Sequence, residues 1–200
     1  PVRALFDYAG EQFLASLPLI HILTVTTAQD DRIRLHGLFI GKDRKVFENA
    51  VALSQEKNII LLDRPVKKMV VALDEREFKS TWVGDKAIYR TRMAIADGGD
   101  LIVLAPGVNR FGEDSEVDRL IRKYGYRGRE QVIRHVRDNQ DLRANLSAAA
   151  HLIHGSSEGR FSVTYCVRHL SRDEVEGVGY RYLPYDEAIG EYARLSEGWN

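Results

Sequence analysis

Residues 81–114 read TWVGDKAIYRTRMAIADGGDLIVLAPGVNRFGED, and this stretch decides the fold. Apolar residues recur at three- and four-residue steps over 84–97, which predicts an amphipathic helix. The next run, 101–105, is apolar throughout and has the length of a buried strand. A loop with two glycines follows at 106–114. A helix, a buried strand and a loop in this order are typical of an α/β layer.

The sequence on both sides of this stretch alternates in the same way. Short apolar runs alternate with amphipathic ones, which predicts an α/β fold with a layered, mainly parallel sheet and flanking helices. Ligands in such sheets bind beyond the carboxyl ends of the strands, so 106–114 and the loop after Val167 form a candidate ligand edge. The expected elements are a strand at 69–73, helices at 115–124, 128–139 and 141–154, a strand at 160–167, a helix at 171–177, a strand at 179–183 and a helix at 185–197.

The region before Pro65 has a different pattern, which indicates a small α+β segment. We place the domain boundary near this proline, with one domain at 1–66 and a second at 67–200. Because the chain opens at Pro1, already in a helical pattern, we expect it to be a piece of a longer protein. The elements expected in the first domain are a helix at 2–16, strands at 19–27 and 32–41 joined by a turn at Asp30-Asp31, and a helix at 42–57.

The composition excludes several classes of function. The 29 basic and 29 acidic residues balance, so there is no basic excess of the kind that binds nucleic acid or an anionic membrane. No apolar run approaches the roughly 20 residues of a membrane span and no signal peptide is present, so we expect a cytoplasmic protein. Cys166 is the only cysteine, which excludes an internal disulfide and a thiolate zinc site. The six histidines form no H-E-x-x-H motif, and we predict no metal site.

Two glycine-bearing motifs have plain structural explanations. Residues 155–159, GSSEG, match the G-x-S-x-G nucleophile elbow, which needs a strand before the serine and a helix after it. The predicted order here is the reverse, so we interpret Gly155 as a helix end and the serines as a turn. The loop 106–112 precedes a helix for which Ser115 is the expected N-cap. Two interpretations of this loop stay open, an ordinary loop and a carboxylate-binding site.

One face of the predicted helix at 84–97 is the candidate binding surface. At about 100° per residue, the side opposite the apolar stripe collects Lys86, Tyr89, Arg90 and Met93. A solvent-exposed face rarely carries a tyrosine and a methionine among its charges. Either Tyr89 and Met93 pack under a neighbouring loop with the two cations extended over them, or this face binds something.

The same helix carries a resemblance to a known family. The stretch DKAIYRTRMAIADGG at 85–99, followed by DLIVLAPGV at 100–108, resembles the C-terminal domain of the nickel-pincer lactate racemase family. The start of the chain, Pro1-Val2-Arg3, and the segment Gly37–Gly41 also fit that family's chain before its C-terminal domain. The resemblance continues through RKYGYRG at 122–128, NLSAAAHLIHGSSEGRF at 145–161 and the segment from His169 to Tyr180.

The resemblance implies a two-lobed enzyme that racemises or epimerises a 2-hydroxy acid at C2. The N-terminal lobe would hold a nickel-pincer nucleotide that takes the hydride, and the C-terminal lobe would close over the substrate. Residues 1–66 would end the cofactor lobe, with the cofactor's ligands upstream of Pro1 and none on this chain. The chain alone is then expected to be inactive, and its partners are the missing N-terminal lobe and a small 2-hydroxy acid. A homo-oligomer stays open.

The resemblance also implies roles for four residues. On the matching helix the lactate racemases carry a tyrosine, then a glutamine, then a lysine three positions later. Tyr89 matches the tyrosine, while Arg90 stands in place of the glutamine and Met93 in place of the lysine. We therefore expect Lys86, Tyr89, Arg90 and Met93 to bind a substrate more polar than lactate, such as an aldonate, and we assign no catalytic residue. The alternative is a non-catalytic α/β binding or interaction module whose polar helix face contacts a partner protein.

Overall fold

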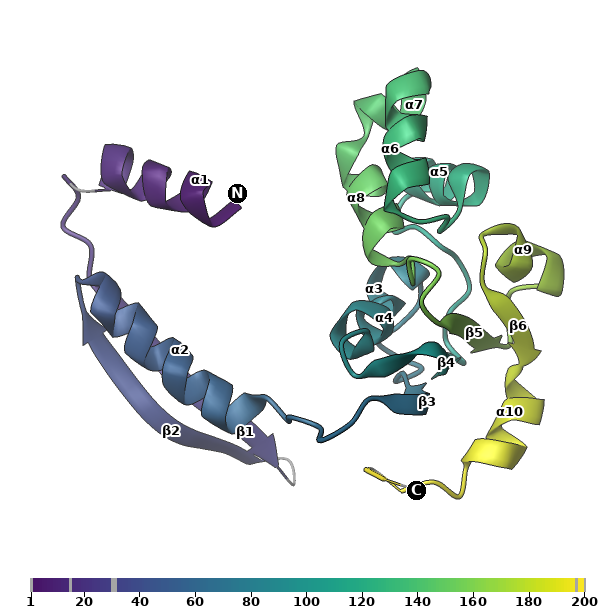
Figure 1. Ribbon diagram of the computed structural model, residues 1–200, viewed down its shortest axis with the longest axis horizontal. Coiled ribbons are helices and arrows are strands. Elements are labelled where there is room, and N and C mark those ends of the chain that lie inside the picture. Colours follow the sequence, from purple (N-terminus) through teal and green to yellow (C-terminus); the bar gives the residue numbers. More distant parts are fainter. Residues whose placement is uncertain (1, 15, 30–31, 197, 200) are drawn as a thin grey trace. The chain divides into compact units, whose positions relative to one another are not determined.

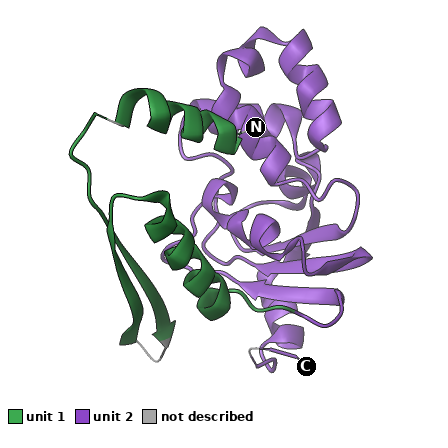
Figure 2. Ribbon diagram, turned by 60° about the vertical axis from the view of Figure 1, so that its left-hand side comes forward, with its two compact units in different colours: residues 1–61 green, residues 62–200 purple. Residues whose placement is uncertain are grey.

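The computed structural model describes residues 2–14, 16–29, 32–196 and 198–199. The chain divides into two compact units, Pro1–Leu61 and Leu62–Asn200 (Figure 2). The division therefore follows Leu61, whereas the sequence placed a boundary after residue 66. Each unit has its own sheet.

The first unit is a small α+β segment (Figure 1). Helix α1 (Val2–Ala9) continues into a π-helical turn, η1 (Gly10–Leu14), so the predicted helix at 2–16 is present only in part as α-helix. Strands β1 (His21–Gln29) and β2 (Arg32–Gly41) pair antiparallel as predicted, and helix α2 (Arg44–Asn58) contacts both. The predicted turn at Asp30-Asp31 lies outside the described residues.

The second unit is built on a four-stranded parallel sheet of order β3-β4-β5-β6. This confirms the predicted α/β fold, and every strand pair in the sheet is parallel. The two interior strands are β4 and β5. The strands are β3 (Val66–Ala72), β4 (Ile95–Leu104), β5 (Ser162–Val167) and β6 (Arg181–Pro184).

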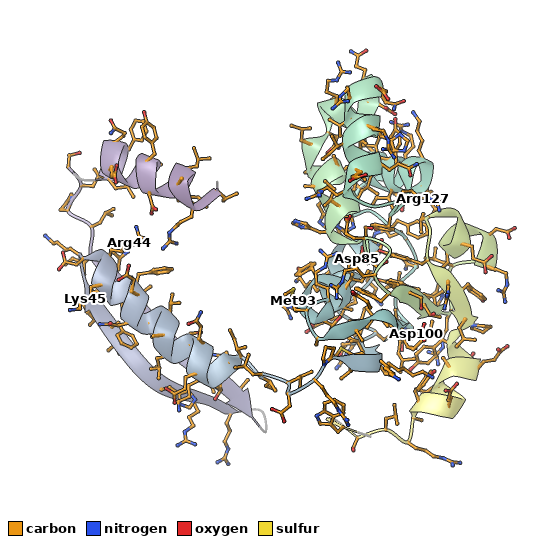
Figure 3. The ribbon with its side chains drawn as sticks, in the orientation of Figure 1. Arg44, Lys45, Asp85, Met93, Asp100 and Arg127 are labelled. Atoms are coloured by element: carbon orange, nitrogen blue, oxygen red, sulfur yellow. The ribbon has the colours of Figure 1, made fainter. Side chains whose placement is uncertain are left out.

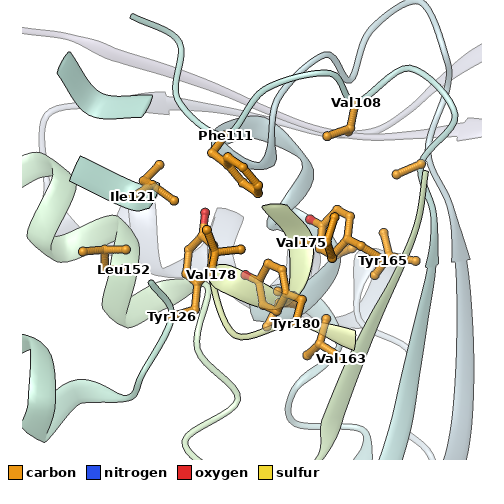
Figure 4. Close-up of a cluster of buried hydrophobic side chains, with 14 of the residues drawn as sticks. Val108, Phe111, Ile121, Tyr126, Leu152, Val163, Tyr165, Val175, Val178 and Tyr180 are labelled. Carbon is orange, nitrogen blue, oxygen red and sulfur yellow. The ribbon is translucent and has the colours of Figure 1, made fainter. Parts of the chain in front are cut away.

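Helices cover both faces of this sheet, because successive side chains of a strand point to opposite faces. Leu101 and Val103 of β4 belong to the larger core, which includes side chains from α5, α8 and α9 (Figure 4). Ile102 and Leu104 belong to a smaller core under α10. The helices are α3 (Thr81–Gly84), α4 (Lys86–Thr91), α5 (Ser115–Tyr124), α6 (Arg129–Asp138), α7 (Gln140–Ala144), α8 (Leu146–His154), α9 (Arg172–Gly177) and α10 (Tyr185–Tyr192).

The predicted single helix at 84–97 is wrong. Helix α4 ends at Thr91, a turn spans 92–94, and β4 begins at Ile95. The parallel partner decides this boundary, since Val66 of β3 pairs with Ile95 and, after a register shift, the ladder resumes at Asp100 and runs to Leu104. Pairing with a buried strand thus overrides a local pattern that is compatible with a helix.

The predicted helix at 141–154 is divided in two. Asn145 separates α7 from α8, and its side chain accepts a hydrogen bond from the backbone N–H of Ala148, so it caps the second helix. Leu146, the first residue of α8, is 62% exposed, whereas His151, later in the same helix, is buried.

Helix α5 is capped by Asp114 rather than by Ser115. The Asp114 carboxylate accepts the backbone N–H of Val117 at 2.8 Å, whereas the Ser115 side chain is exposed. We expect Asp114→Ala to lower the free energy of unfolding by about 1 kcal/mol, the usual value of an N-cap, and Ser115→Ala to change it by a few tenths. Urea unfolding of the two variants measures the difference. Equal losses would show that the cap is assigned to the wrong residue.

Candidate functional site

Three of the four predicted binding residues lie on α4. Lys86, Tyr89 and Arg90 are spaced by three and four residues along it, and Met93 lies in the turn that follows. Met93 is 86% exposed, so it does not pack under a loop in the described part of the chain (Figure 3). Tyr89 is 40% exposed. The structure therefore brings together Lys86, Tyr89 and Arg90 on one short helix and leaves Met93 outside it.

The two cations of α4 have no acidic partner. Within the described residues, neither Lys86 nor Arg90 takes part in an ion pair or a side-chain hydrogen bond. Most other arginines of this unit do, as in the contact of Arg160 with Asp97 at 2.7 Å. An unpaired guanidinium and an unpaired ammonium one turn apart are suited to bind a carboxylate.

A histidine from α8 borders the same helix. The ring of His154 lies 6.2 Å from the ring of Tyr89, measured between centroids. Arg92, in the turn after α4, donates to the backbone carbonyl of Ser156, just after α8, and so ties the ends of the two helices together. We call Lys86, Tyr89, Arg90 and His154 the α4 surface.

Asp85, directly before α4, points the other way, into the core. It occupies the N-cap position of α4, yet its side chain makes no capping hydrogen bond and is 0% exposed (Figure 3). The Tyr165 hydroxyl donates to Oδ1 at 2.6 Å, and the Tyr180 hydroxyl lies 3.0 Å from Oδ2. An aspartate that would ordinarily cap a helix is here bonded to two tyrosines of the core.

His151 of α8 extends these contacts. Its Nε2 lies 3.4 Å from Asp85 Oδ2 and 2.9 Å from the Tyr126 hydroxyl. The Tyr126 hydroxyl in turn lies 2.8 Å from Thr81 Oγ1, and the Trp82 ring covers the imidazole at 4.4 Å. We call this set of buried polar side chains the core network: Thr81, Asp85, Tyr126, His151, Tyr165 and Tyr180.

The three tyrosines of the core network are stacked (Figure 4). Tyr180 lies between the other two, 4.5 Å from Tyr126 and 4.9 Å from Tyr165 between ring centroids. Tyr165 belongs to β5, Tyr180 precedes β6 and Tyr126 connects α5 to α6. Segments that are far apart in the sequence therefore meet at the start of α4.

Burial controls the charges of the core network. It raises the pKa of Asp85 to about 7, although the hydroxyls of Tyr165, Tyr180 and Tyr126 oppose the shift. Burial also lowers the pKa of His151 to about 4, with the nearby His154 as a lesser cause. At neutral pH the His151 ring is therefore uncharged, and its contact with Asp85 is not an ion pair.

Gly155 follows α8 as predicted, and it has a second role. A Cβ at this position would lie 2.3 Å from Asp85 Oδ2 and 2.5 Å from the Tyr126 ring. Only a residue without a side chain lets α8 end directly against the core network.

The predicted ligand edge is filled by the chain itself. The backbone N–H groups of Phe111 and Gly112, which could have bound a carboxylate ligand, donate to the Asp118 side chain at 2.7 and 3.1 Å. Beyond β5, Arg168 pairs with Asp186 at 3.2 Å. The ordinary-loop interpretation of 106–114 therefore holds.

A cavity of about 100 Å³ lies at the amino ends of β5 and β6. Tyr126 and Tyr180 line it together with Ser157, Ser162 and Arg181. None of the four residues of the α4 surface is among those that line it.

Neither a metal centre nor a membrane span emerges from the described residues. Over 2–14, 16–29, 32–196 and 198–199, no group of three or more histidine, cysteine, aspartate and glutamate side chains is placed to hold a metal ion. None of the helices in those ranges combines the length and the apolar character needed to cross a bilayer.

Sequence reasoning missed most of the core network. Asp85 falls inside the predicted helix at 84–97, and no role was predicted for Tyr126, Tyr165 or Tyr180. The available signal was weak: tyrosines in otherwise aliphatic segments need a partner for their hydroxyls when they are buried. Nothing local identifies that partner as Asp85.

Comparison with known proteins shows the fold but not the family. No protein-family model and no curated protein matches the chain. The crystal structure of a Thermotoga maritima protein, a structural genomics target, matches 96% of this chain and 49% of its own at a TM-score of 0.75 and 23% identity. The lactate racemase apoprotein from Thermoanaerobacterium thermosaccharolyticum matches 78% of this chain and 37% of its own at a TM-score of 0.55 and 13% identity. The chain thus spans half or less of the solved proteins that it resembles.

Proposed function

We propose that this chain is the substrate-capping part of a nickel-pincer-dependent racemase or epimerase acting on a 2-hydroxy acid more polar than lactate. The observation that carries the proposal is the α4 surface, where Lys86 and Arg90 lie one helical turn apart and have no acidic partner among the described residues. The distant structural similarity to lactate racemase, over 78% of this chain, supports it. Both observations agree with the resemblance of residues 85–108 to that family.

The residues of the α4 surface suit distinct parts of such a substrate. The Arg90 guanidinium can hold a carboxylate through two parallel hydrogen bonds, and Lys86 adds a point charge one turn away. The Tyr89 hydroxyl can donate to or accept from a hydroxyl of the acid. With Met93 in place of a lysine, Arg90 takes over the cationic role, and its longer, planar group suits a larger and more polar acid.

Within the described residues no group of three or more metal-ligating side chains is placed to hold a metal ion, and Cys166, the one thiol, is buried with its pKa raised by burial to about 12. In this proposal the contacts to the nickel-pincer nucleotide lie in polypeptide outside this chain, and the α4 surface binds substrate alone. In this proposal the chain by itself has no racemase activity.

The reaction class is tested on the intact protein, produced together with the enzymes that make the cofactor. Single stereoisomers of lactate, malate and gluconate are incubated with it, and epimer formation is followed by NMR. We expect epimerisation of gluconate in preference to lactate. No epimerisation by a protein that carries nickel would contradict the proposed substrate class. A protein that binds no nickel would favour the alternative, a non-catalytic α/β binding or interaction module.

Arg90→Ala is expected to raise KM for the acid by about tenfold to a hundredfold, because a hydrogen bond to a charged group contributes about 1.5–3 kcal/mol. The effect on kcat should be smaller, since the carboxylate is bound equally in the ground state and the transition state. Arg134→Ala on α6 removes an exposed guanidinium far from α4 in the sequence and is the matched control. Equal KM values for the two variants would exclude Arg90 from the site.

A further inference from the structure

Each hydrogen bond in the core network needs one proton from a donor group. If Asp85 is ionised, the hydroxyls of the network are too few to donate to all of its acceptors. The Tyr180 hydroxyl lies 2.8 Å from the carbonyl oxygen of Gly155 and 3.0 Å from Asp85 Oδ2. A carbonyl only accepts, and a hydroxyl has a single proton to donate. When Tyr180 donates to Gly155, its contact with Asp85 is a hydrogen bond only if the carboxyl group carries a proton on Oδ2.

The other carboxyl oxygen of Asp85, Oδ1, accepts its hydrogen bond from a different residue. Tyr165 has its hydroxyl 2.6 Å from Oδ1 and is the donor there. The bonds then run in one direction, from Tyr165 to Asp85, from the Oδ2 proton to Tyr180, and from Tyr180 to the Gly155 carbonyl. Each bond has one proton and each hydroxyl donates once. Ionisation of Asp85 would remove one of these protons and leave a charge in a fully buried position.

A second chain of bonds fixes where His151 carries a proton. Thr81 donates its hydroxyl proton to the Phe111 carbonyl at 3.0 Å, so Tyr126 donates to Thr81 and His151 Nε2–H donates to Tyr126. Because burial lowers the pKa of His151 to about 4, the ring is neutral at pH 7 and Nε2 holds its single proton.

The groups that face Asp85 are therefore all uncharged at neutral pH. They come from β5, from the segments before β6 and α6, and from α8, while Lys86 and His154 lie outside the core. The titratable groups around the carboxyl are Tyr165, Tyr180, Tyr126 and His151.

We propose that below neutral pH Asp85 is a neutral carboxylic acid in the folded protein and that, as a hydrogen-bond donor, it is the positioning residue that holds the start of α4 against the core. Asp85 directly precedes Lys86, so the bonds from Asp85 to Tyr165 and Tyr180 fix where α4 begins. The further statement that α4 presents Lys86, Tyr89 and Arg90 to a substrate rests on the proposed function. The protonation state of Asp85 is independent of that function.

The direction of the pH dependence follows from burial. Burial raises the pKa of Asp85 from its ordinary value of 3.8 to about 7 in the folded protein. Between these values the folded state holds a proton that the unfolded state has released, so the free energy of unfolding falls as pH rises through this range. Below pH 3.8 Asp85 is protonated in both the folded and the unfolded state, so it no longer makes the free energy of unfolding depend on pH.

Asp85→Asn tests the protonation state. The amide keeps an acceptor for Tyr165 and an N–H donor for Tyr180, so the variant should fold with the core network intact. We expect wild type to lose stability relative to this variant from about pH 4 to about pH 7, with a constant difference above that range. The proposal would be overturned if the free energy of unfolding changed with pH in the same way in both proteins. It would also be overturned if Asp85→Asn were much less stable than wild type at neutral pH.

Infrared spectroscopy gives a second readout that needs no unfolding. A protonated carboxyl group has a carbonyl stretch well separated from that of a carboxylate. Wild type at about pH 6, below the pKa of Asp85, should show this band, Asp85→Asn should lack it, and Tyr180→Phe should shift it because its hydrogen-bond acceptor is lost. Absence of the band in folded wild type below pH 7 would overturn the proposal even if every variant failed to fold.

The positioning role is tested in the intact enzyme by a pair of variants. Asp85→Ala removes both hydrogen bonds and should raise KM about tenfold or more with a smaller change in kcat, and Asp85→Asn should restore KM to near wild type. Equal KM values in Asp85→Ala and wild type would overturn the positioning role. If no 2-hydroxy acid reacts, the proposed function fails, while the unfolding and infrared results still decide the state of Asp85.

Discussion

Tyr165→Ala is expected to lower the free energy of unfolding of the second unit by about 3–5 kcal/mol, the usual cost of truncating a buried aromatic side chain. Tyr165 is 1% exposed on an interior strand and stacks on Tyr180 at 4.9 Å. Its hydroxyl donates to Asp85. The truncation therefore leaves a cavity in the core and also removes one of the two tyrosine hydroxyls bonded to a buried carboxyl group.

Tyr165→Phe separates the two contributions. It keeps the ring and its stacking and removes only the hydroxyl, which should cost about 1–3 kcal/mol for the acceptor left without a donor. Urea unfolding of both variants, with the slope of the transition as a check on two-state behaviour, measures the difference. Equal losses in the two variants would mean that the ring contributes nothing beyond its hydroxyl, which would contradict the packing described here.

Gly155→Ala is expected to cost about 3 kcal/mol, the upper end of the usual cost of overpacking a core. The added methyl group would lie 2.3 Å from Asp85 Oδ2 and 2.5 Å from the Tyr126 ring, and both groups are held in the core network. Alanine ordinarily stabilises a helix end relative to glycine when the backbone permits it, so the sign here is opposite to the propensity.

Gly177→Ala is the matched control for that substitution. Gly177 ends α9, and a Cβ there would meet nothing within 4 Å. We expect a change within about 0.5 kcal/mol or a small stabilisation. Thermal and urea unfolding of the two alanine variants compare them directly. Similar stabilities would show that α8 does not end as closely against Asp85 as the structure places it.

The α/β fold was predictable because the information is local. The run at 101–105 is apolar throughout, the run at 160–167 is rich in β-branched and aromatic residues, and amphipathic segments separate the two, so both sheet and helices follow from the pattern. The boundary at Ile95 was not predictable in this way, since it depends on pairing with Val66, 29 residues earlier in the chain.

The candidate site was predictable only on its outer side. Lys86, Tyr89 and Arg90 share a helix, and their spacing places them together. Asp85 meets Tyr180 across a sequence separation of 95 residues, and no local pattern reports such a contact. The carboxyl group beside His151 is also that of Asp85, which comes from a different element, so the sequence around the histidine does not indicate this contact.

The proposal that α4 binds a 2-hydroxy acid is tested most directly by NMR on the isotopically labelled intact protein. The protein is titrated with gluconate and, separately, with its 2-deoxy analogue. We predict that the backbone amide signals of Lys86, Tyr89 and Arg90 shift with gluconate, and shift less at equal concentrations of the analogue, because only gluconate offers both a carboxylate and a 2-hydroxyl. Shifts confined to other segments, such as those around Arg181, or equal shifts with both compounds, would contradict the assignment of the α4 surface.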